Sequence, residues 1–345
     1  MTRVAIVGAA GYAGAELVRL VIGHPSLDLT VVTSSQDVGK RVCDLYPALA
    51  GCDLAYVEHD ATLVAAHADL AFLAVPHTAA MAMVPALLDA GLLVVDASAD
   101  FRLKDAVVFE RWYDAAHTAP ELLAEAVYGL PELWRDLIPG ARLVACPGCY
   151  PTATLLAAAP AVRAGVVTSP KVIVDAISGV SGAGRTPNAT THYVNASESV
   201  SAYRVAAHRH TPEIAQGLND LGLDGAGLVF TPHLAPLDRG LLATVYLEVA
   251  PELDLEAAHA LYAAAYAGEP FITVCAPGLQ PATGHVRGSN RAHLGVALDE
   301  ATHTLVVTCA IDNLVKGTSG QAVQCANLLL GLPETNGLDH PVPVV

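Results

Sequence analysis

The chain has 345 residues, of which 53% are hydrophobic and 15% charged, and its 18 basic and 34 acidic side chains give a net charge of -16. Single hydrophobic cores stop growing near about 300 residues, so this length predicts two domains. The net charge repels nucleic acid and anionic membranes, and no apolar run reaches the roughly 18 residues that span a bilayer. We therefore expect a soluble α/β protein with no nucleic-acid or membrane partner.

The N-terminus and the cysteines favour the cytoplasm. Residues 1–3 lead directly into an apolar run at 4–7, without the successive regions of a signal peptide. Seven scattered cysteines in a long chain are not typical of a disulfide framework, so we expect reduced thiols. Five of them are expected to be buried structural side chains: Cys43, Cys52, Cys275, Cys309 and Cys325.

Short apolar runs alternate with helical patterns in the first part of the chain. The predicted strands are 4–7, 29–33, 70–75, 92–96 and 143–146. Strands that alternate with helices predict βα units and a parallel sheet. We therefore expect residues 1–148 to form a Rossmann-type parallel-sheet domain.

Longer β-rich runs, such as 171–177 and 241–249, follow from about residue 171, with one clear helix at 255–267. This pattern predicts an α+β domain over residues 149–312. Apolar side chains at helical spacing within 313–330 predict a C-terminal helix. We expect this helix to return to the first domain, so that residues 313–345 complete it.

A glycine-rich turn lies between the first predicted strand and a helical sequence. Gly8, Gly11 and Gly14 occur in the order that a dinucleotide site requires, and Tyr12 begins the helix. Glycines let the backbone approach a pyrophosphate, and the helix N-terminus supplies free amides. The alternative is an ordinary strand-to-helix turn. The position after the first strand favours a cofactor site.

The end of the second predicted strand indicates which cofactor binds. NAD enzymes usually place an acidic residue there for the ribose hydroxyls. Here the strand ends in Ser34 and Ser35, with Lys40 and Arg41 shortly after and Asp37 displaced. Hydroxyls and cations suit a 2′-phosphate, so we expect NADP, although the two basic residues could instead belong to a solvated loop.

Cys149 is the strongest candidate for a nucleophile. It follows Pro147-Gly148 and precedes a helical sequence, so it lies at a helix N-terminus, where the dipole lowers a thiol pKa. A buried structural cysteine is the alternative. Cys146 completes a C-x-x-C pattern, which is also found in thiol-disulfide oxidoreductases and zinc sites. No second C-x-x-C exists in the sequence, and a thioredoxin-like protein explains neither the length nor the glycine turn.

The segment His208-Arg209-His210-Thr211-Pro212-Glu213 is the densest ionisable group in the second domain. It could bind a metal, form a solvated turn or supply acid-base catalysis. A metal would need a third ligand at suitable spacing, and none is obvious. Imidazole titrates near neutral pH, so acid-base work beside a thiolate fits better.

Six ordered motifs together resemble the N-acetyl-gamma-glutamyl-phosphate reductases of arginine biosynthesis, relatives of the aspartate-semialdehyde dehydrogenases. The motifs cover nearly the whole chain: 8–20, 98–102, 147–152, 178–185, 208–214 and 313–317. The resemblance implies an NADP-binding Rossmann domain, a catalytic and oligomerisation domain inserted before the C-terminal helix, and Cys149 as the nucleophile. It also implies NADPH-dependent reduction of an acyl phosphate to a semialdehyde through a cysteine thioester, with release of phosphate.

The resemblance also assigns roles within the motifs. His210 is the first choice for the general acid-base, with His208 and Glu213 as orienting groups, although the sequence does not rank the two histidines. Guanidinium and ammonium groups match phosphate and carboxylate. The expected substrate-binding residues are Arg102, Arg185, Arg209 and Lys316, and the further cofactor-binding residues are Ser178, Gly179 and Asn313.

Some alternatives stay open at this point. The family commonly has Asn where this chain has Cys146, which makes a reversible disulfide with Cys149 conceivable. A reductase of an aminoadipyl phosphate, perhaps bound to a carrier protein, is the rival within the family. A catalytically silent NADP sensor is the rival from another class. The resemblance implies a homodimer or homotetramer.

Overall fold

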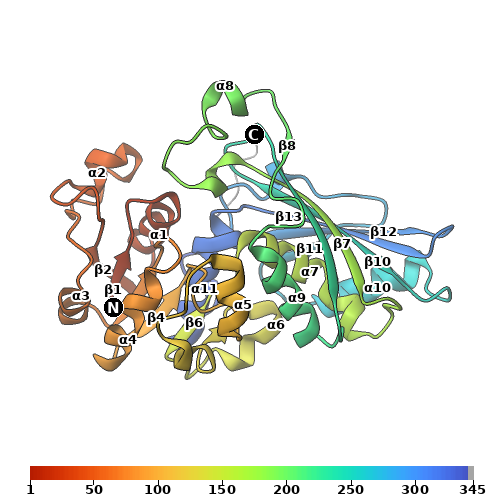
Figure 1. Ribbon diagram of the computed structural model, residues 1–345, viewed down its shortest axis with the longest axis horizontal. Helices are drawn as coiled ribbons and strands as arrows, with labels where there is room; N and C mark the ends of the chain where they lie inside the picture. Colours follow the sequence, from red (N-terminus) through yellow and green to blue (C-terminus); the bar gives the residue numbers. More distant parts are fainter. Residues whose placement is uncertain (341–345) are drawn as a thin grey trace. The chain divides into compact units, whose positions relative to one another are not determined.

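The computed structural model describes residues 1–340 and contains two compact units (Figure 1). One unit consists of Met1–Pro147 and Thr318–His340, and the other of Gly148–Gly317. Within the described residues, none of the helices is long and apolar enough to cross a membrane.

The first unit is built on a six-stranded sheet in which every pair is parallel. This confirms the predicted parallel sheet, although the short strand β5 was missed because two residues carry no period. The strands, in the order β2-β1-β3-β4-β6-β5, are Leu27–Val32, Thr2–Val7, Leu70–Leu73, Leu93–Asp96, Leu143–Ala145 and Val127–Tyr128.

The helices of the first unit follow its strands along the chain. The longest are α1 and α4, which follow β1 and β3, and the C-terminal helix α11. The α-helices are α1 (Tyr12–Ile22), α2 (Val42–Leu45), α3 (Ala61–His67), α4 (Ala80–Asp89), α5 (Ala106–Tyr113), α6 (Pro131–Trp134) and α11 (Gly320–Leu329), and the 3-10 turns are η1 (Pro47–Leu49), η2 (Pro120–Leu123) and η3 (Arg135–Leu137).

The C-terminal segment joins the first unit, as expected, but its helix begins later than residue 313. A π-helical turn, η6 (Val315–Ser319), precedes α11. The Gly317 amide donates to the Asp312 carbonyl oxygen at 2.9 Å, which is the wide five-residue spacing of a π-turn, and the Asp312 carboxylate accepts the amides of Leu314 and Val315. The helix α11 then packs against α1 and β4.

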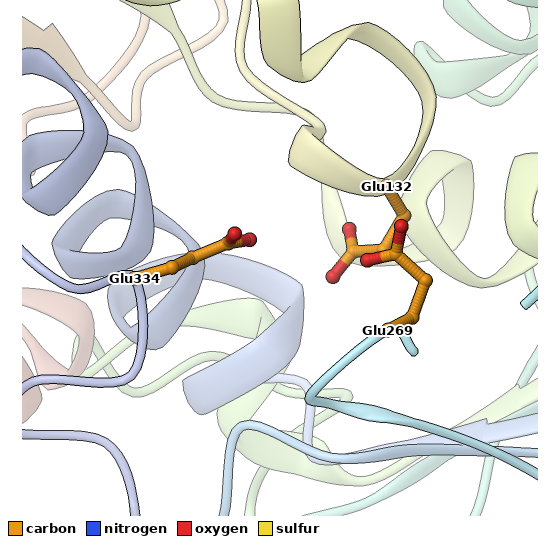
Figure 2. Close-up of side chains that lie close together, drawn as sticks. All are labelled: Glu132, Glu269 and Glu334. Atoms are coloured by element: carbon orange, nitrogen blue, oxygen red, sulfur yellow. The ribbon is translucent and has the colours of Figure 1, made fainter. Parts of the chain in front are cut away.

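Side chains of the first unit hold this C-terminal segment. The Gln324 amide donates to Glu132 at 3.0 Å and to Glu334 at 2.7 Å, and Arg135 pairs with Glu334 at 2.9 Å. Figure 2 shows the carboxylates of Glu132 and Glu334 turned toward one another, which fits an amide that lies between them.

The second unit contains a mixed seven-stranded sheet with helices, so the α+β expectation is confirmed. Its strands, in the order β11-β12-β13-β10-β7-β9-β8, are Ile272–Val274, Ala292–Asp299, Thr304–Ile311, Leu241–Glu248, Lys171–Ser178, Gly227–Leu234 and Ser201–Ala202. The helices are α7 (Cys149–Arg163), α8 (Tyr193–Ala196), α9 (His210–Asp220) and α10 (Leu255–Ala265), with 3-10 turns η4 (Val180–Ala183) and η5 (Thr283–His285).

Helix α7 is the core helix of the second unit. Thirteen consecutive residues, 150–162, are buried, and the helix packs against β10, β13, α9 and α10. Its sequence suits this position because alanines allow close packing on all sides. Pro160 lies inside the helix and has no amide hydrogen, so the carbonyl of Leu156 lacks its usual helical donor. The hydroxyl of Tyr266 donates to that carbonyl instead.

The replaced hydrogen bond makes a testable prediction about stability. Tyr266→Phe leaves the Leu156 carbonyl buried without a donor and is expected to lower the free energy of unfolding by about 2 kcal/mol. Tyr262→Phe is the matched control, because the Tyr262 hydroxyl donates, at 2.6 Å, to the Ala157 carbonyl, which has its own helical donor four residues on. Urea denaturation of both variants measures the difference. Equal losses would contradict this role of Tyr266.

Candidate active site

A glycine turn joins β1 to α1. Gly8 has a φ of +84°, and a Cβ at this position would lie 2.5 Å from the carbonyl oxygen of Ala74. A Cβ at Gly14 would overlap the carbonyl oxygen of Gly8. Gly11 is the N-cap of α1, and Tyr12 is the first residue of the helix. The turn is therefore a cradle of bare backbone at a helix N-terminus, which fits a dinucleotide pyrophosphate.

The turn after β2 carries the side chains expected to select NADP. The buried Ser34 hydroxyl accepts the amides of Gln36 at 3.2 Å and Asp37 at 3.1 Å. The Asp37 carboxylate is buried as well and pairs with Lys40 at 2.9 Å. Ser35 is exposed. The buried carboxylate nearest to β2 is thus already neutralised by a cation.

The segment after β4 holds buried charges. Arg102 is buried, and its guanidinium donates to the carbonyl oxygens of Cys146 at 2.7 Å and Ala97 at 2.9 Å. Asp96 is fully buried and accepts the amide and the hydroxyl of Ser98, both at 2.8 Å. Burial, together with a neighbouring carboxylate, raises the pKa of Asp96 to about 7. Arg102 therefore connects the ends of two strands in the first unit.

Cys149 lies at the N-terminus of α7. Its thiol is in no disulfide and is partly buried, and Gly148 is the N-cap. The Gly148 amide donates to the Glu213 carboxylate at 2.9 Å, so the first turn of α9 is tied to the residue before the cysteine. Gly317 packs against Cys149: a Cβ at position 317 would lie 2.7 Å from the cysteine Cβ. Three chain segments thus fix the position of the thiol.

Aromatic rings and both histidines surround the first turn of α7. The Tyr150 ring contacts His208 at 5.4 Å, His210 at 5.9 Å and Phe230 at 5.2 Å between ring centroids. The two histidine rings are 4.8 Å apart. The Tyr203 ring lies 5.6 Å from His208, and its hydroxyl is 3.0 Å from that of Tyr150. The histidine segment therefore lies beside the helix that begins with Cys149.

The two histidines differ in their surroundings. Burial and, to a smaller extent, the positive charges of Arg204 and Arg209 together lower the pKa of His208 to about 4. The backbone amide of His210 donates to Nδ1 of His208 at 3.1 Å. An Nδ1 that accepts a hydrogen bond carries no proton, so His208 is a neutral imidazole near pH 7.

The pKa values of Tyr150 and Tyr203 are both raised. Burial raises the pKa of Tyr203 to about 12, and burial raises that of Tyr150 further; the negative charge of the Cys149 thiolate contributes to both shifts. Both hydroxyls therefore keep their protons at neutral pH, and one of them donates to the other across 3.0 Å.

A second network lies around the segment before η6. The Asn313 side chain accepts the Gly240 amide at 2.8 Å and donates to the Ser181 hydroxyl at 3.0 Å. Gly179 is needed for close approach, since a Cβ there would lie 2.9 Å from the Leu237 carbonyl oxygen. Ser178 is buried beside it. These predicted cofactor residues are therefore brought together on adjoining loops of the second unit.

The remaining predicted substrate residues are more scattered. Arg209 is the N-cap of α9 beside the two histidines, and Arg185 lies partly buried in the loop after η4. Lys316 is fully buried in η6, with Nζ 5.9 Å from the centroid of the Phe271 ring. Arg102 belongs to the first unit and the other three to the second.

Sequence reasoning missed Tyr203, Gly317 and Asp312. Tyr203 stands five residues before His208 in an irregular loop, so only its nearness to the histidine segment could have indicated it. Gly317 acts through a contact with a residue 168 positions earlier, as the numbers of Cys149 and Gly317 show. The Asp312 carboxylate pairs with Arg239 at 3.2 Å and accepts backbone amides.

The cysteines are only partly as expected. All seven are free thiols within the described residues, and Cys52, Cys309 and Cys325 are buried. The prediction of burial was wrong for Cys43 and Cys275, which are partly exposed because they stand in a short helix and at a strand end near the surface. Cys146 is fully buried.

Family models match both halves of the chain. A semialdehyde dehydrogenase NAD binding domain matches residues 3–141, and a semialdehyde dehydrogenase dimerisation domain matches residues 149–313. Among solved structures, aspartate semialdehyde dehydrogenase II of Vibrio cholerae has a TM-score of 0.74 at 18% identity, covering 96% of this chain and 98% of that one. The Candida albicans enzyme, solved with NADP, has a TM-score of 0.71 at 15% identity, with 95% and 98% covered. These structures show the shared fold.

Curated relatives are much closer in sequence. Proteins named N-acetyl-gamma-glutamyl-phosphate reductase are 48% identical in Geobacter sp. strain M21, over 98% of both chains, and 48% identical in Heliobacterium modesticaldum, over 98% of both. The protein of that name from Janthinobacterium sp. is 46% identical over the whole of both chains. The chain therefore belongs to the N-acetyl-gamma-glutamyl-phosphate reductase family, as its motifs predicted.

Proposed function

We propose that this protein reduces N-acetyl-gamma-glutamyl phosphate with NADPH to N-acetyl-L-glutamate 5-semialdehyde and phosphate, a step of arginine synthesis. The observation that carries the proposal is a cysteine thiol outside any disulfide at the N-terminus of α7, held by Gly148 and Gly317 beside two histidines and a buried glutamate. The names of relatives that are 46–48% identical support the same substrate and do not favour an aminoadipyl phosphate.

Cys149 is the nucleophile of this proposal. The α7 amides and helix dipole stabilise a thiolate at its N-terminus. The thiolate attacks the γ-acyl carbon, a C–S bond forms, and the C–O bond to the phosphate group breaks, so that inorganic phosphate leaves with the electron pair. The acyl group then stays on the enzyme as a thioester and is not released by hydrolysis as the free acid.

The cofactor site is assigned to the glycine turn of the first unit. The bare backbone at Gly8 and Gly14 would hold the pyrophosphate of a nicotinamide dinucleotide, with Gly11 and Tyr12 at the helix N-terminus. When bound, NADPH supplies the hydride that reduces the acyl group carried by Cys149.

The preference for NADP rests on the turn after β2. Ser34 and Ser35 offer hydroxyls to a 2′-phosphate, and the Asp37 carboxylate, which a bare ribose would need, is buried against Lys40. Arg41 pairs with Asp44 at 2.8 Å, on the exposed side of the same loop.

His210 is assigned as the general acid-base. Its neighbour His208 is neutral and uses Nδ1 to accept the His210 amide, which leaves it to orient the segment and not to carry charge. Glu213 positions the residue before the thiol through its hydrogen bond to the Gly148 amide. After hydride transfer, His210 donates a proton to the oxygen of the tetrahedral thiohemiacetal and takes it back as the C=O bond re-forms and the C–S bond breaks, which releases the semialdehyde and returns the Cys149 thiolate.

The cations have to overcome a net charge of -16 when an anionic substrate approaches. Arg185, Arg209 and Lys316 are proposed to bind its phosphate and carboxylates, and Arg102 is proposed to act from the first unit. Ser178, Gly179 and Asn313 are proposed to line the cofactor pocket.

A second copy of the chain is the proposed partner. One face of the second sheet carries exposed apolar side chains in register: Ile173 pairs with Val229, and Ile177 lies four residues further along the same face. The match to a dimerisation domain supports a homodimer or a tetramer built from dimers. The cytoplasmic location stays a prediction.

Cys149→Ala tests the nucleophile. Without the thiolate no thioester forms, so the turnover number is expected to fall by at least about 10³-fold. The assay follows NADP reduction by N-acetylglutamate semialdehyde with inorganic phosphate, which tests cofactor, phosphate and substrate together. Cys43→Ala is the matched control, because Cys43 is a partly buried thiol of the first unit. Phosphate-dependent NADP reduction that survives in Cys149→Ala would refute the assignment.

The two histidines are separated by their pH profiles. His210→Asn is expected to lower kcat/KM by about 10²-fold or more and to remove the ionisation of the base from the profile. His208→Asn is expected to lower kcat/KM by less than about tenfold and to keep that ionisation, because His208 is neutral at the working pH. The opposite pattern would assign the proton transfer to His208.

The lowered pKa of His208 also predicts how stability depends on pH. The pKa of His208 in the folded protein, about 4, lies below the ordinary value of 6.5, so the folded protein binds this proton less tightly than the unfolded chain does. The contribution is complete above pH 6.5 and is lost as the pH falls toward 4, by about 3 kcal/mol. Urea denaturation between these pH values should show a shallower decline in His208→Asn than in the exposed control His303→Asn. Identical declines would contradict the neutral His208.

A further inference from the structure

The loop after β3, residues 74–79, lies against the glycine turn. Strand β3 is the neighbour of β1 in the sheet, and a Cβ at Gly8 would meet Ala74 and Val75. The chain runs from β1 outward to β2 and returns on the other side of β1 to β3, so β1 and β3 flank the switch point of the strand order. Ligands of open parallel sheets bind at this point, outside the carboxyl ends of the strands. Loop 74–79 is therefore a wall of the proposed dinucleotide site.

This loop contains an unusual backbone conformation. Thr78 has a φ of +74°, in the left-handed region. A β-branched side chain rarely adopts this region, because its Cβ substituents crowd the backbone. Such a residue stays there only when its surroundings hold it, and strain of this kind concentrates at ligand sites.

Asp100 supplies the restraint. Its carboxylate is fully buried and accepts the amide of Thr78 at 2.7 Å through one oxygen and the amide of Met81 at 3.0 Å through the other. Met81 lies in the first turn of α4, whose own N-cap, Ala79, provides no side-chain hydrogen bond. Asp100 therefore caps α4 from a segment 19 residues further along the chain and at the same time fixes the strained residue before it.

The Asp100 segment is itself held firmly. The Ser98 hydroxyl accepts the Asp100 amide at 3.2 Å, and the His117 ring contacts the Asp100 carbonyl oxygen at 2.9 Å. The backbone of Asp100 is thus held on both sides, so a substitution of its side chain is expected to affect loop 74–79 before the Asp100 segment itself.

We propose that Asp100 is a positioning residue of the cofactor site, which holds Thr78 in its left-handed conformation so that loop 74–79 keeps the shape that binds the dinucleotide. The inference rests on the proposed NADPH site and adds a determinant of its affinity. Asp100 does not touch the cofactor in this proposal, and it acts through the backbone of the loop.

The test measures the Kd of NADPH by fluorescence titration of the full chain, together with thermal unfolding. Asp100→Ala removes both acceptors and is expected to weaken NADPH binding about tenfold. Asp100→Asn, which keeps one acceptor oxygen, gives a smaller loss in the same direction and serves if Asp100→Ala does not fold. Asp105→Ala is the matched control: Asp105 caps α5 of the same unit with hydrogen bonds of 2.7 and 3.4 Å, and its loss is expected to change the Kd less than about twofold.

Rescue distinguishes positioning from stability alone. Glycine adopts the left-handed region without strain, so Thr78→Gly makes the loop independent of its restraint. The double variant Asp100→Ala/Thr78→Gly is expected to bind NADPH within about threefold of Thr78→Gly, although it remains less stable than the intact protein. The double variant Asp100→Asn/Thr78→Gly, compared with Thr78→Gly alone, gives a second comparison with a smaller change at Asp100.

Two outcomes would overturn the proposal. In one, Asp100→Ala and Asp105→Ala lower the unfolding temperature alike while both keep the NADPH affinity. In the other, Thr78→Gly fails to rescue, and the loss caused by Asp100→Ala or Asp100→Asn is the same in both backgrounds. If instead the unaltered protein does not bind NADPH, the proposed function itself fails, and this result is read before any variant is compared.

Discussion

The burial of α7 is the constraint on which the second unit depends. A helix that is buried from its second residue to residue 162 cannot shift without disturbing the sheet on one side and α9 and α10 on the others. Its first residue, Cys149, therefore has a fixed position, and the polar groups of the site are arranged around that position. The proline inside this helix is tolerated because the Tyr266 hydroxyl replaces the donor that it removes.

The same constraint bears on the thiolate proposed at Cys149 in a protein with a net charge of -16. The charge of the whole chain acts at long range and is screened by salt, whereas a helix terminus acts within one turn. Two protonated tyrosine hydroxyls and a neutral His208 lie beside the first turn of α7 without adding negative charge. Local donors thus outweigh the unfavourable overall charge.

Much of the fold could be predicted from the sequence, because most of its helices and strands depend on local patterns of apolar and polar residues. The parallel strands are apolar runs between helical patterns, and the C-terminal helix has an apolar period. Cys149 and the glycine turn could be singled out because their chemistry depends on residues within a few positions. Strand β5 could not be predicted, since two residues have no period. The π-helical turn could not be predicted either, since the Asp312 carboxylate just before it is held by distant partners, the Arg239 guanidinium and the Gly288 amide.

The parts of the site that were missed depend on contacts between distant segments. Gly317 is required by the Cys149 side chain, and the Tyr203 hydroxyl is close to that of Tyr150 only because β8 pairs with β9 next to it. The spacing of these residues along the sequence does not indicate either contact. The same reason hides the cap that Asp100 provides, since a helix N-cap is recognised in a sequence only when it directly precedes the helix.

Cys146 shows how burial changes the meaning of a short motif. The C-x-x-C spacing alone permits a redox pair or half of a metal site. In the structure the Cys146 side chain is fully buried. Its backbone amide donates to the backbone carbonyl oxygen of Asp96 at 2.7 Å, and its carbonyl oxygen accepts a hydrogen bond from the Arg102 guanidinium. A thiol buried in that position packs as a small apolar side chain. Its backbone carries the structural role, which any side chain of similar size at this position would leave intact.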